Sequence, residues 1–281
     1  MAKPRVSACI TFDFDAISGW MDEENPLPNP LSRGEFGGRV AAPRLLELLD
    51  RYGITSSWYI PGHTADTFPA LVKEIADRGH EIAHHGYLHE TPSGIGSREA
   101  EAEIIERGSK ALERVTGRKV TGYRSPSWNV SEHTLELLHQ MGFSYDSSLM
   151  WDDFRLSYVR LGDQPKSRSA YVFGREVDLV EVPIAWELDD WQWFEYAPPW
   201  SEGLFAPSRV EAFWLNEFNY AYQHEPGAVY TLTMHPQVIG RGVRIAMLER
   251  VLRHIRSHAD VEFRTVEEVV AEFRSETPFG R

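Results

Sequence analysis

Three features are scarce or absent in this sequence, and each absence excludes a class of protein. Only one of the 281 residues is cysteine, Cys9, so no disulfide framework can form within the chain. Lys and Arg number 29 against 42 Asp and Glu, a net charge of −13, which argues against nucleic acid and membrane partners. No apolar run approaches the roughly 20 residues that cross a bilayer. The first residues, MAKPRVSACITFDFD, contain no apolar signal segment, and we therefore expect a cytoplasmic protein.

The sequence does contain a regular alternation of strand-like and helix-like segments. The expected strands are residues 6–12, 56–60, 80–83, 120–123, 145–148, 179–183, 228–234 and 261–264. The expected helices are residues 40–52, 68–78, 97–115, 131–141, 208–223 and 243–256, with a last helix after Thr265; Ser208/Glu211 and Thr265/Glu268 have the spacing of capping boxes. The alternation predicts an α/β fold, a mainly parallel sheet or barrel of about seven strands with helices outside. No linker divides the chain, so we expect a single domain over residues 1–281.

Three stretches do not follow this pattern. Residues 21–38 are rich in Pro and Gly and are typical of a long loop. The stretch between the strands 145–148 and 179–183 has no clear periodicity. Residues 186–200 are aromatic, but they are too polar and irregular for a core element. We expect the early loop and the aromatic segment to be able to cover a site and narrow it.

Ionisable residues gather at the carboxyl ends of the predicted strands, where α/β barrels carry out their chemistry. Asp13 and Asp15 end the first strand, and their spacing points both carboxylates to one side of an extended chain. One carboxylate can then bind a metal while the other accepts a proton from water. A single Asp at this place is more often a turn or capping residue, but two Asp on one side of a strand end favour a metal-binding or catalytic role.

His85 and His89 follow the third predicted strand and are four residues apart. On a helical turn this spacing lets both rings reach one ion. The spacing alone is weak evidence, because His80/His84 and His254/His258 share it. His80 and His84 lie in or beside a strand, where residues four positions apart are far from each other. His254 and His258 lie in the last turn of a predicted helix, where positive side chains are favoured by the negative end of the helix dipole. Two His and one carboxylate make a common catalytic zinc set.

Two further residues occupy strand ends. Arg124 can pair with Asp13 and hold it ionised, although an ordinary salt bridge would also explain it. His235, after the strand 228–234, can protonate a leaving nitrogen. A lone His in this position is more often structural, and its weight comes from the residues that accompany it.

Four motifs in this order resemble the polysaccharide deacetylase family, also called the NodB-homology or carbohydrate esterase 4 family. They are TFDFDA at residues 11–16, HGYLH at 85–89, RSPSW at 124–128 and TMH at 233–235. Phe14 splits the usual adjacent Asp pair, Ala16 replaces Gly, Gly86 replaces Ser or Thr, Trp128 replaces Tyr, and Thr233 replaces Leu. The split pair resembles a branch that includes intracellular cyclic imide hydrolases and a Helicobacter-type peptidoglycan deacetylase homologue.

The resemblance implies a distorted (β/α)7 barrel and an assignment of roles. Asp15, His85 and His89 would bind a divalent metal, taken to be Zn²⁺, with Co²⁺, Mn²⁺ or Ni²⁺ as alternatives. Asp13 would be the general base, oriented by Arg124, and His235 the general acid. The backbone N–H groups near Trp128 would help to hold the oxyanion. Pro126 of the same motif would lie in the substrate site, and the branch implies a homo-oligomer such as a tetramer.

The sequence favours a small cyclic imide or amide as the substrate. The departures from the family motifs and the absence of an export signal both argue against a large polysaccharide. An N-acetylated sugar or peptidoglycan is the alternative, since exposed aromatic residues also suit sugar stacking. A metal- or carbohydrate-binding module without catalysis is the alternative from another class, but a binder would need neither Asp13 nor His235. Trp191 and His63 are further candidates for substrate contact, although aromatic packing between loops would explain Trp191 as well.

Overall fold

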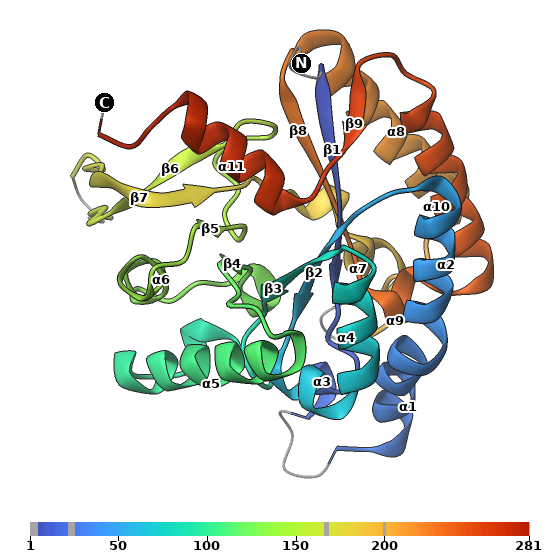
Figure 1. Cartoon of the computed structure of the whole chain (residues 1–281), viewed down its shortest axis with the longest axis horizontal. Coiled ribbons are helices and arrows are strands. Elements are labelled where there is room, and N and C mark those ends of the chain that lie inside the picture. The colour runs from blue at the N-terminus through green and yellow to red at the C-terminus, as the bar shows by residue number, and fades with distance from the viewer. Residues whose placement is uncertain (1–4, 22–25, 166–168, 199–200, 281) are drawn as a thin grey trace.

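A curled, mainly parallel sheet forms the centre of the protein in the computed structural model, which describes residues 5–21, 26–165, 169–198 and 201–280 (Figure 1). The sheet order is β6-β7-β5-β4-β3-β2-β1-β8, with β9 paired to β1 beside β2. The strands are β1 (Val6–Asp13), β2 (Ser57–Ile60), β3 (Glu81–His84), β4 (Gly122–Tyr123), β5 (Tyr145–Asp146), β6 (Ser157–Leu161), β7 (Arg175–Glu181), β8 (Ala228–Met234) and β9 (Val261–Phe263). All strand pairs are parallel except β6 with β7.

Helices follow most of the strands and pack around the sheet (Figure 1). The longer ones are α1 (Pro28–Phe36), α2 (Ala42–Tyr52), α4 (Pro69–Asp77), α5 (Arg98–Thr116), α6 (Thr134–Met141), α8 (Pro207–His224), α10 (Gly242–Arg256) and α11 (Val266–Glu276). The short ones are η1 (Ser18–Trp20), η2 (Gly37–Ala41), α3 (Gly62–Thr67), η3 (Pro92–Gly94), η4 (Pro126–Trp128), η5 (Trp186–Leu188), α7 (Asp190–Phe194) and α9 (Pro236–Ile239). Among the described residues, no helix is both long and apolar enough to span a membrane.

Strand β1 lies in the middle of the core, and all eight of its residues are buried. A strand covered on both faces reads as a continuous apolar run, which is why residues 6–12 were predictable. Its two faces still differ, because alternate side chains point to opposite sides. Ile10 and Phe12 pack in the cluster that contains Trp58 and Leu45, whereas Cys9 belongs to the cluster that α11 joins. Thr11 and Asp13 lie on the same face of the strand as Cys9.

The α/β fold with a curled, partly closed barrel agrees with the sequence prediction, and so do most helix positions. The predicted capping box of the last helix is confirmed, because Thr265 accepts from the N–H of Glu268 and the Glu268 side chain accepts from Thr265. The other predicted box is wrong. Helix α8 begins at Pro207, its N-cap is Ala206, and no side chain caps it. Proline at the first helical position has no N–H that needs a partner, and the N–H of Arg209 donates to the carbonyl oxygen of Ala206 at 2.9 Å in place of a side-chain cap.

All three irregular stretches contain elements that the sequence did not predict, and in the aromatic stretch these are η5 and α7. The expected loop 21–38 includes α1, with proline in its first turn; residues 22–25 lie outside the described residues. The unpatterned stretch contains β6, which pairs antiparallel with β7 at the end of the sheet, and β7 itself starts at Arg175. Several residues of both strands are exposed or half-buried, so neither follows the apolar pattern of the central strands.

Candidate metal centre and catalytic site

Asp15, His85 and His89 meet at the carboxyl ends of β1 and β3. The Nε2 atoms of His85 and His89 lie 3.5 and 3.7 Å from Asp15 Oδ1, and one potential ligand atom from each residue falls within 4.8 Å of the others. Asp15 and His85 are buried and His89 is half-buried. The sequence prediction that these three side chains converge therefore agrees with the geometry.

The three side chains fit a divalent cation. Asp15 Oδ1 is buried and has no hydrogen-bond partner among the described residues, as expected for an atom kept for a metal. His85 Nδ1 lies 2.8 Å from the carbonyl oxygen of Arg124, which can only accept, so Nδ1 carries the proton and Nε2 keeps its lone pair. Burial lowers the pKa of His85 to about 4, so the ring is neutral, as a ligand must be. Two imidazoles and a carboxylate suit zinc, and they also suit other divalent transition metals.

The turn between His85 and His89 is fixed by its own backbone contacts. Glu90 Oε2 accepts the N–H groups of Tyr87 at 3.1 Å and Leu88 at 2.7 Å. Gly86 has φ +73°, and a Cβ there would lie 3.1 Å from the Pro126 ring. Glycine at this position satisfies both the backbone conformation and the close approach of Pro126. Pro126 therefore packs against the turn between His85 and His89.

Asp13 is buried beside a fully buried arginine. Arg124 Nη1 donates to Asp13 Oδ1 at 2.7 Å and to Thr11 Oγ1 at 3.0 Å, and the indole Nε1 of Trp128 is 3.4 Å from Asp13 Oδ2. Burial alone would raise the pKa of Asp13, but the positive charge of Arg124, with smaller contributions from His85 and His235, holds it below the usual value. Asp13 is therefore an ionised carboxylate, and the predicted Arg124–Asp13 pair is present.

His235 faces the same site from the end of β8. Its Nε2 is 3.8 Å from Asp15 Oδ2, while its Nδ1 is 2.8 Å from Asp190 Oδ1 and 3.5 Å from Asp189 Oδ1. Burial alone would lower the pKa of His235, but the charges of Asp189 and Asp190 and the Asp190 hydrogen bond raise it well above the ordinary value. The ring is therefore an imidazolium, and its Nδ1 donates to Asp190.

Asp189 and Asp190 are site residues that the sequence prediction missed. They lie in the aromatic stretch, which was expected to be too irregular for the core, yet both are buried. Asp189 forms an isolated parallel bridge with Thr233 and accepts from the N–H of Trp191, so it places α7 against β8. Two adjacent Asp inside an aromatic run were the available signal. From the sequence alone, such a pair does not indicate that its partner is His235, because only the folded position of β8 brings the two together.

The four predicted substrate residues have different surroundings. Pro126 and Trp128 form the turn beside Asp13, but the backbone N–H of Trp128 donates to Ser125 O at 3.0 Å. The expectation that backbone N–H groups near Trp128 help to hold an oxyanion stays a prediction, with this one N–H already bonded within the turn. The Trp191 ring is 5.4 Å from the His235 ring. His63 packs edge-on against Tyr87 instead, and the described residues show no contact between His63 and the Asp15, His85 and His89 side chains.

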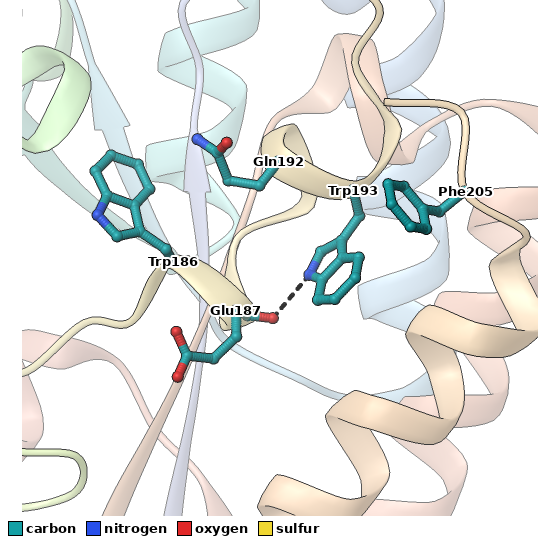
Figure 2. A pocket seen from close by; sticks show the side chains of 5 residues that line it. All are labelled: Trp186, Glu187, Gln192, Trp193 and Phe205. Atoms are coloured by element: carbon teal, nitrogen blue, oxygen red, sulfur yellow. Dashed lines mark hydrogen bonds between the residues drawn. The ribbon is translucent and has the colours of Figure 1, made fainter. Parts of the chain in front are cut away.

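An aromatic groove lies along the segment that contains η5 and α7 (Figure 2). A pocket of about 510 Å³ is lined by Trp186, Glu187, Gln192, Trp193 and Phe205. Trp193 Nε1 donates to the carbonyl oxygen of Glu187 at 2.9 Å, which fixes one wall of the groove. Trp186 stacks on Trp128 with ring centroids 4.5 Å apart and remains 39% exposed. The stacked pair therefore connects the groove to Asp13, while Trp200 lies outside the described residues.

Comparison with known proteins agrees with this geometry. Residues 7–145 match the polysaccharide deacetylase family model. The chain is 36% identical to the peptidoglycan deacetylase of Helicobacter pylori, and the match covers 99% of both chains. The chain belongs to the polysaccharide deacetylase family. A Mycobacterium smegmatis crystal structure assigned to polysaccharide deacetylases shares 32% identity at a TM-score of 0.86, covering 98% of this chain and 92% of the other. An allantoinase, at 18% identity and a TM-score of 0.82, shares the fold over 99% and 93% of the two chains.

Membership of the polysaccharide deacetylase family establishes the class of reaction. The protein is a hydrolase that acts on carbon–nitrogen bonds other than peptide bonds. Family members are metalloenzymes that use a divalent metal, and the Asp15, His85 and His89 cluster is the matching candidate site here. The split Asp pair does not separate the two carboxylates. Phe14 points to the other side and packs on Trp58 and Phe68, while Asp13 and Asp15 both face the site.

Proposed function

We propose that the protein hydrolyses a non-peptide amide or imide with Asp15, His85 and His89 as ligands of a divalent metal, Asp13 as the general base and His235 as the general acid. One observation carries this proposal. Two buried groups of opposite charge, the Asp13 carboxylate and the His235 imidazolium, lie next to the cluster, and each is held in its charge state by a buried partner. A base and an acid kept apart in this way are what C–N hydrolysis requires.

The residues of the chain then divide the proton transfers between them. Zinc, when bound, supplies Lewis-acid polarisation of the carbonyl and lowers the pKa of the attacking water. Asp13 accepts the proton of that water, because Arg124 holds its carboxylate ionised and oriented. His235 gives its Nε2 proton to the departing nitrogen. Asp190, bonded to Nδ1, keeps this ring in the orientation that presents Nε2 to the site.

We propose a small cyclic imide or amide as the substrate. The support is the close packing of the early segment over the loop that carries Asp15. A Cβ on Gly34 of α1 would lie only 2.3 Å from Ala16 O, so this helix rests directly on the loop. The ring centroids of Trp20 and Trp191 are 5.9 Å apart, which joins the early segment to the aromatic segment beside His235. Such packing narrows the approach to the site and favours a compact substrate.

An N-acetylated sugar is the second candidate. Trp186 presents a free indole face beside Trp128, and a sugar ring that extends from the site could stack on it. The 36% identical relative is named as a peptidoglycan deacetylase, which agrees with this candidate. The cytoplasmic location, the single domain and the homo-oligomeric assembly expected from the sequence remain predictions.

Metal content and turnover together test the catalytic assignment. The purified enzyme is expected to hold about one divalent ion per chain. His85→Ala should lose that ion and reduce kcat by about a thousandfold or more, since a ligand and the activated water are lost together. His224→Ala is the matched control, because His224 is exposed at the end of α8. A His85→Ala enzyme that retains both metal and activity would refute the assignment.

Parallel assays on a succinimide-type imide and on N-acetylglucosamine oligomers separate the two substrates. If the sugar reading is correct, Trp186→Ala should raise KM for the oligomers by about three- to tenfold, the loss expected for one stacking contact. Phe173→Ala is the control, because Phe173 is 69% exposed and lines no part of the groove. If the imide reading is correct, only the imide is turned over, and Trp186→Ala changes its kinetics less than twofold.

A further inference from the structure

Two buried carboxyl side chains lie behind Arg124 and have no part in the mechanism above. Asp146 ends β5 and Glu181 ends β7, and the two residues are partners in the parallel register of these strands. Neither side chain is exposed. A pair of buried acids on neighbouring strands is costly unless protons or donors compensate it, so the hydrogen bonds of all four oxygens matter.

Three donors reach the pair, and they occupy one oxygen of each acid. Asp146 Oδ1 accepts the Ser148 hydroxyl at 2.7 Å. Glu181 Oε1 accepts the N–H groups of Ser148 at 3.0 Å and Leu149 at 2.9 Å. Asp146 Oδ2 and Glu181 Oε2 are buried and have no partner among the described residues. The Asp146 and Glu181 side chains lie within hydrogen-bonding reach of each other, so a single proton held between them would satisfy both of these oxygens.

The charges around the pair also favour a bound proton. Burial raises the pKa of Asp146 to about 6, and burial together with the neighbouring Asp146 charge raises the pKa of Glu181 well above its usual value. Arg124 acts in the opposite direction on Asp146, but its guanidinium is already bonded to Asp13. The Tyr123 phenol is kept neutral, because burial and the Asp146 charge raise its pKa.

The acids brace the turn that holds Arg124. Arg124 Nε donates a hydrogen bond to the Ser147 carbonyl oxygen at 3.1 Å, and Arg124 Nη2 donates one to the Ser147 hydroxyl at 3.0 Å. The N–H of Ser125 donates to the hydroxyl of the next residue, Ser148, at 2.8 Å. The same hydroxyl donates to Asp146. The side-chain hydrogen bonds of the pair described above therefore end on residues 148–149, directly after the residue that accepts from Arg124.

We propose that Asp146 and Glu181 share one proton and act as positioning residues, fixing residues 147–149 so that Arg124 is held against Asp13. The inference rests on the proposed role of Asp13 as the base. The pair touches neither substrate nor metal ligand, and it acts only through the orientation of Arg124. An amide can replace the shared proton, because its NH₂ group donates to the remaining carboxylate while its oxygen keeps the original donors.

Paired substitutions give the first test. Asp146→Ala and Glu181→Ala should each lower kcat by about tenfold or more with KM within twofold, since the base is misplaced while substrate contacts remain. Asp146→Asn and Glu181→Gln should recover most of that loss, to within about threefold of the parent enzyme. Glu176→Ala, an exposed carboxylate on the same strand β7, is the control. If the amide variants are as damaged as the alanine variants, no proton is shared.

A double-mutant cycle tests whether the pair acts through Arg124. Glu181→Ala combined with Arg124→Ala should have the kcat of Arg124→Ala alone, because the arginine is no longer there to be positioned. A general loss of structure would instead add its own penalty to that of Arg124→Ala. Additive losses of kcat would overturn the proposal. Ser148→Ala, which removes only the link from Asp146 to the Ser125 N–H, serves where an alanine variant of the acids does not fold.

Amide hydrogen exchange gives a readout that needs no substrate. The Ser125 N–H should exchange about tenfold faster in Glu181→Ala and Ser148→Ala than in the parent enzyme, and about as slowly as the parent in Glu181→Gln. Unchanged exchange in both damaged variants would contradict the proposal. If the parent enzyme turns over none of the tested amides, the proposed function fails, and the exchange rates still decide whether the pair holds the turn.

Discussion

At the residue scale, the site depends on buried charges whose partners decide their protonation. Asp13 and Asp15 are two positions apart, yet Arg124 occupies one carboxylate and leaves Oδ1 of the other unpaired. The first environment holds the Asp13 carboxylate ionised, and the second leaves an oxygen of Asp15 that could bind a cation. His235 differs from the candidate ligand His85 for the same reason, because Asp190 holds it as an imidazolium while burial keeps His85 neutral.

The partnership of His235 with Asp190 leads to a prediction about the pH profile. Removal of the Asp190 charge by Asp190→Asn takes away an interaction that raises the His235 pKa. The general acid must be protonated, so the alkaline limb of the kcat/KM profile should move to lower pH, and kcat should fall by about ten- to a hundredfold. Steady-state kinetics between pH 6 and 10 measure both effects.

The control for this experiment is Asp153→Asn, because Asp153 is exposed. An alkaline limb that stays in place in Asp190→Asn would show that His235 is not the acid that defines this limb.

At the element scale, short segments position the site more than long helices do. Helix α7 has only five residues, and it depends on its contacts: Phe194 is buried, and Asp189 caps the first turn. The same segment supplies Asp190 to His235 and Trp193 to the groove. An isolated helix of this length would not form in water, so the tertiary contacts determine its place.

The junction of β2 and β3 gives a prediction about stability. His80 accepts the N–H of Ser56 at 3.1 Å, and burial lowers its pKa to about 4. Between about pH 6.5 and 4 the unfolded chain therefore binds a proton that the folded chain excludes. The unfolding free energy should fall as pH decreases through this window, with at most about 1.4 kcal/mol per pH unit arising from His80.

Urea unfolding at pH 7, 6 and 5 measures this slope. His80→Gln keeps an acceptor for Ser56 and does not titrate, so its stability should depend less steeply on pH. The other buried imidazoles are common to both proteins and cancel in the comparison. His224→Gln, at an exposed position, should keep the parent slope. Equal slopes in His80→Gln and the parent would show that the pKa of His80 is the same in the folded and unfolded chains.

At the scale of the whole molecule, the curl of the sheet brings the site together. Its residues follow β4, β3, β1 and β8, which lie with β2 in one continuous run of the sheet order. Parallel strands all end at the same edge, so residues more than two hundred positions apart become neighbours, such as Asp15 and Gln237 at 3.3 Å. The Asp189–Thr233 bridge then links the chain after β7 to β8 and closes this edge around the site.

The sequence alone determined the alternation of strands and helices and the residues at the strand ends. Periodicity and spacing are local properties, so the segments 6–12, 97–115 and 228–234 could be placed before any coordinates were known. The convergence of Asp15, His85 and His89 followed from one rule, that parallel strands present their carboxyl ends together. The Arg124–Asp13 pair followed from the same reasoning.

Only the tertiary structure decided which buried groups stand behind these residues. Asp190 forms a hydrogen bond with His235, 45 positions away in the sequence, and Glu181 accepts one from the backbone of Ser148, 33 positions away. Neither contact has a periodic signature, because the segments involved take their conformation from the strands and helices around them. For the same reason α1, β6 and α7 did not emerge from the pattern: their stability comes from distant partners, and local propensity carries no record of those partners.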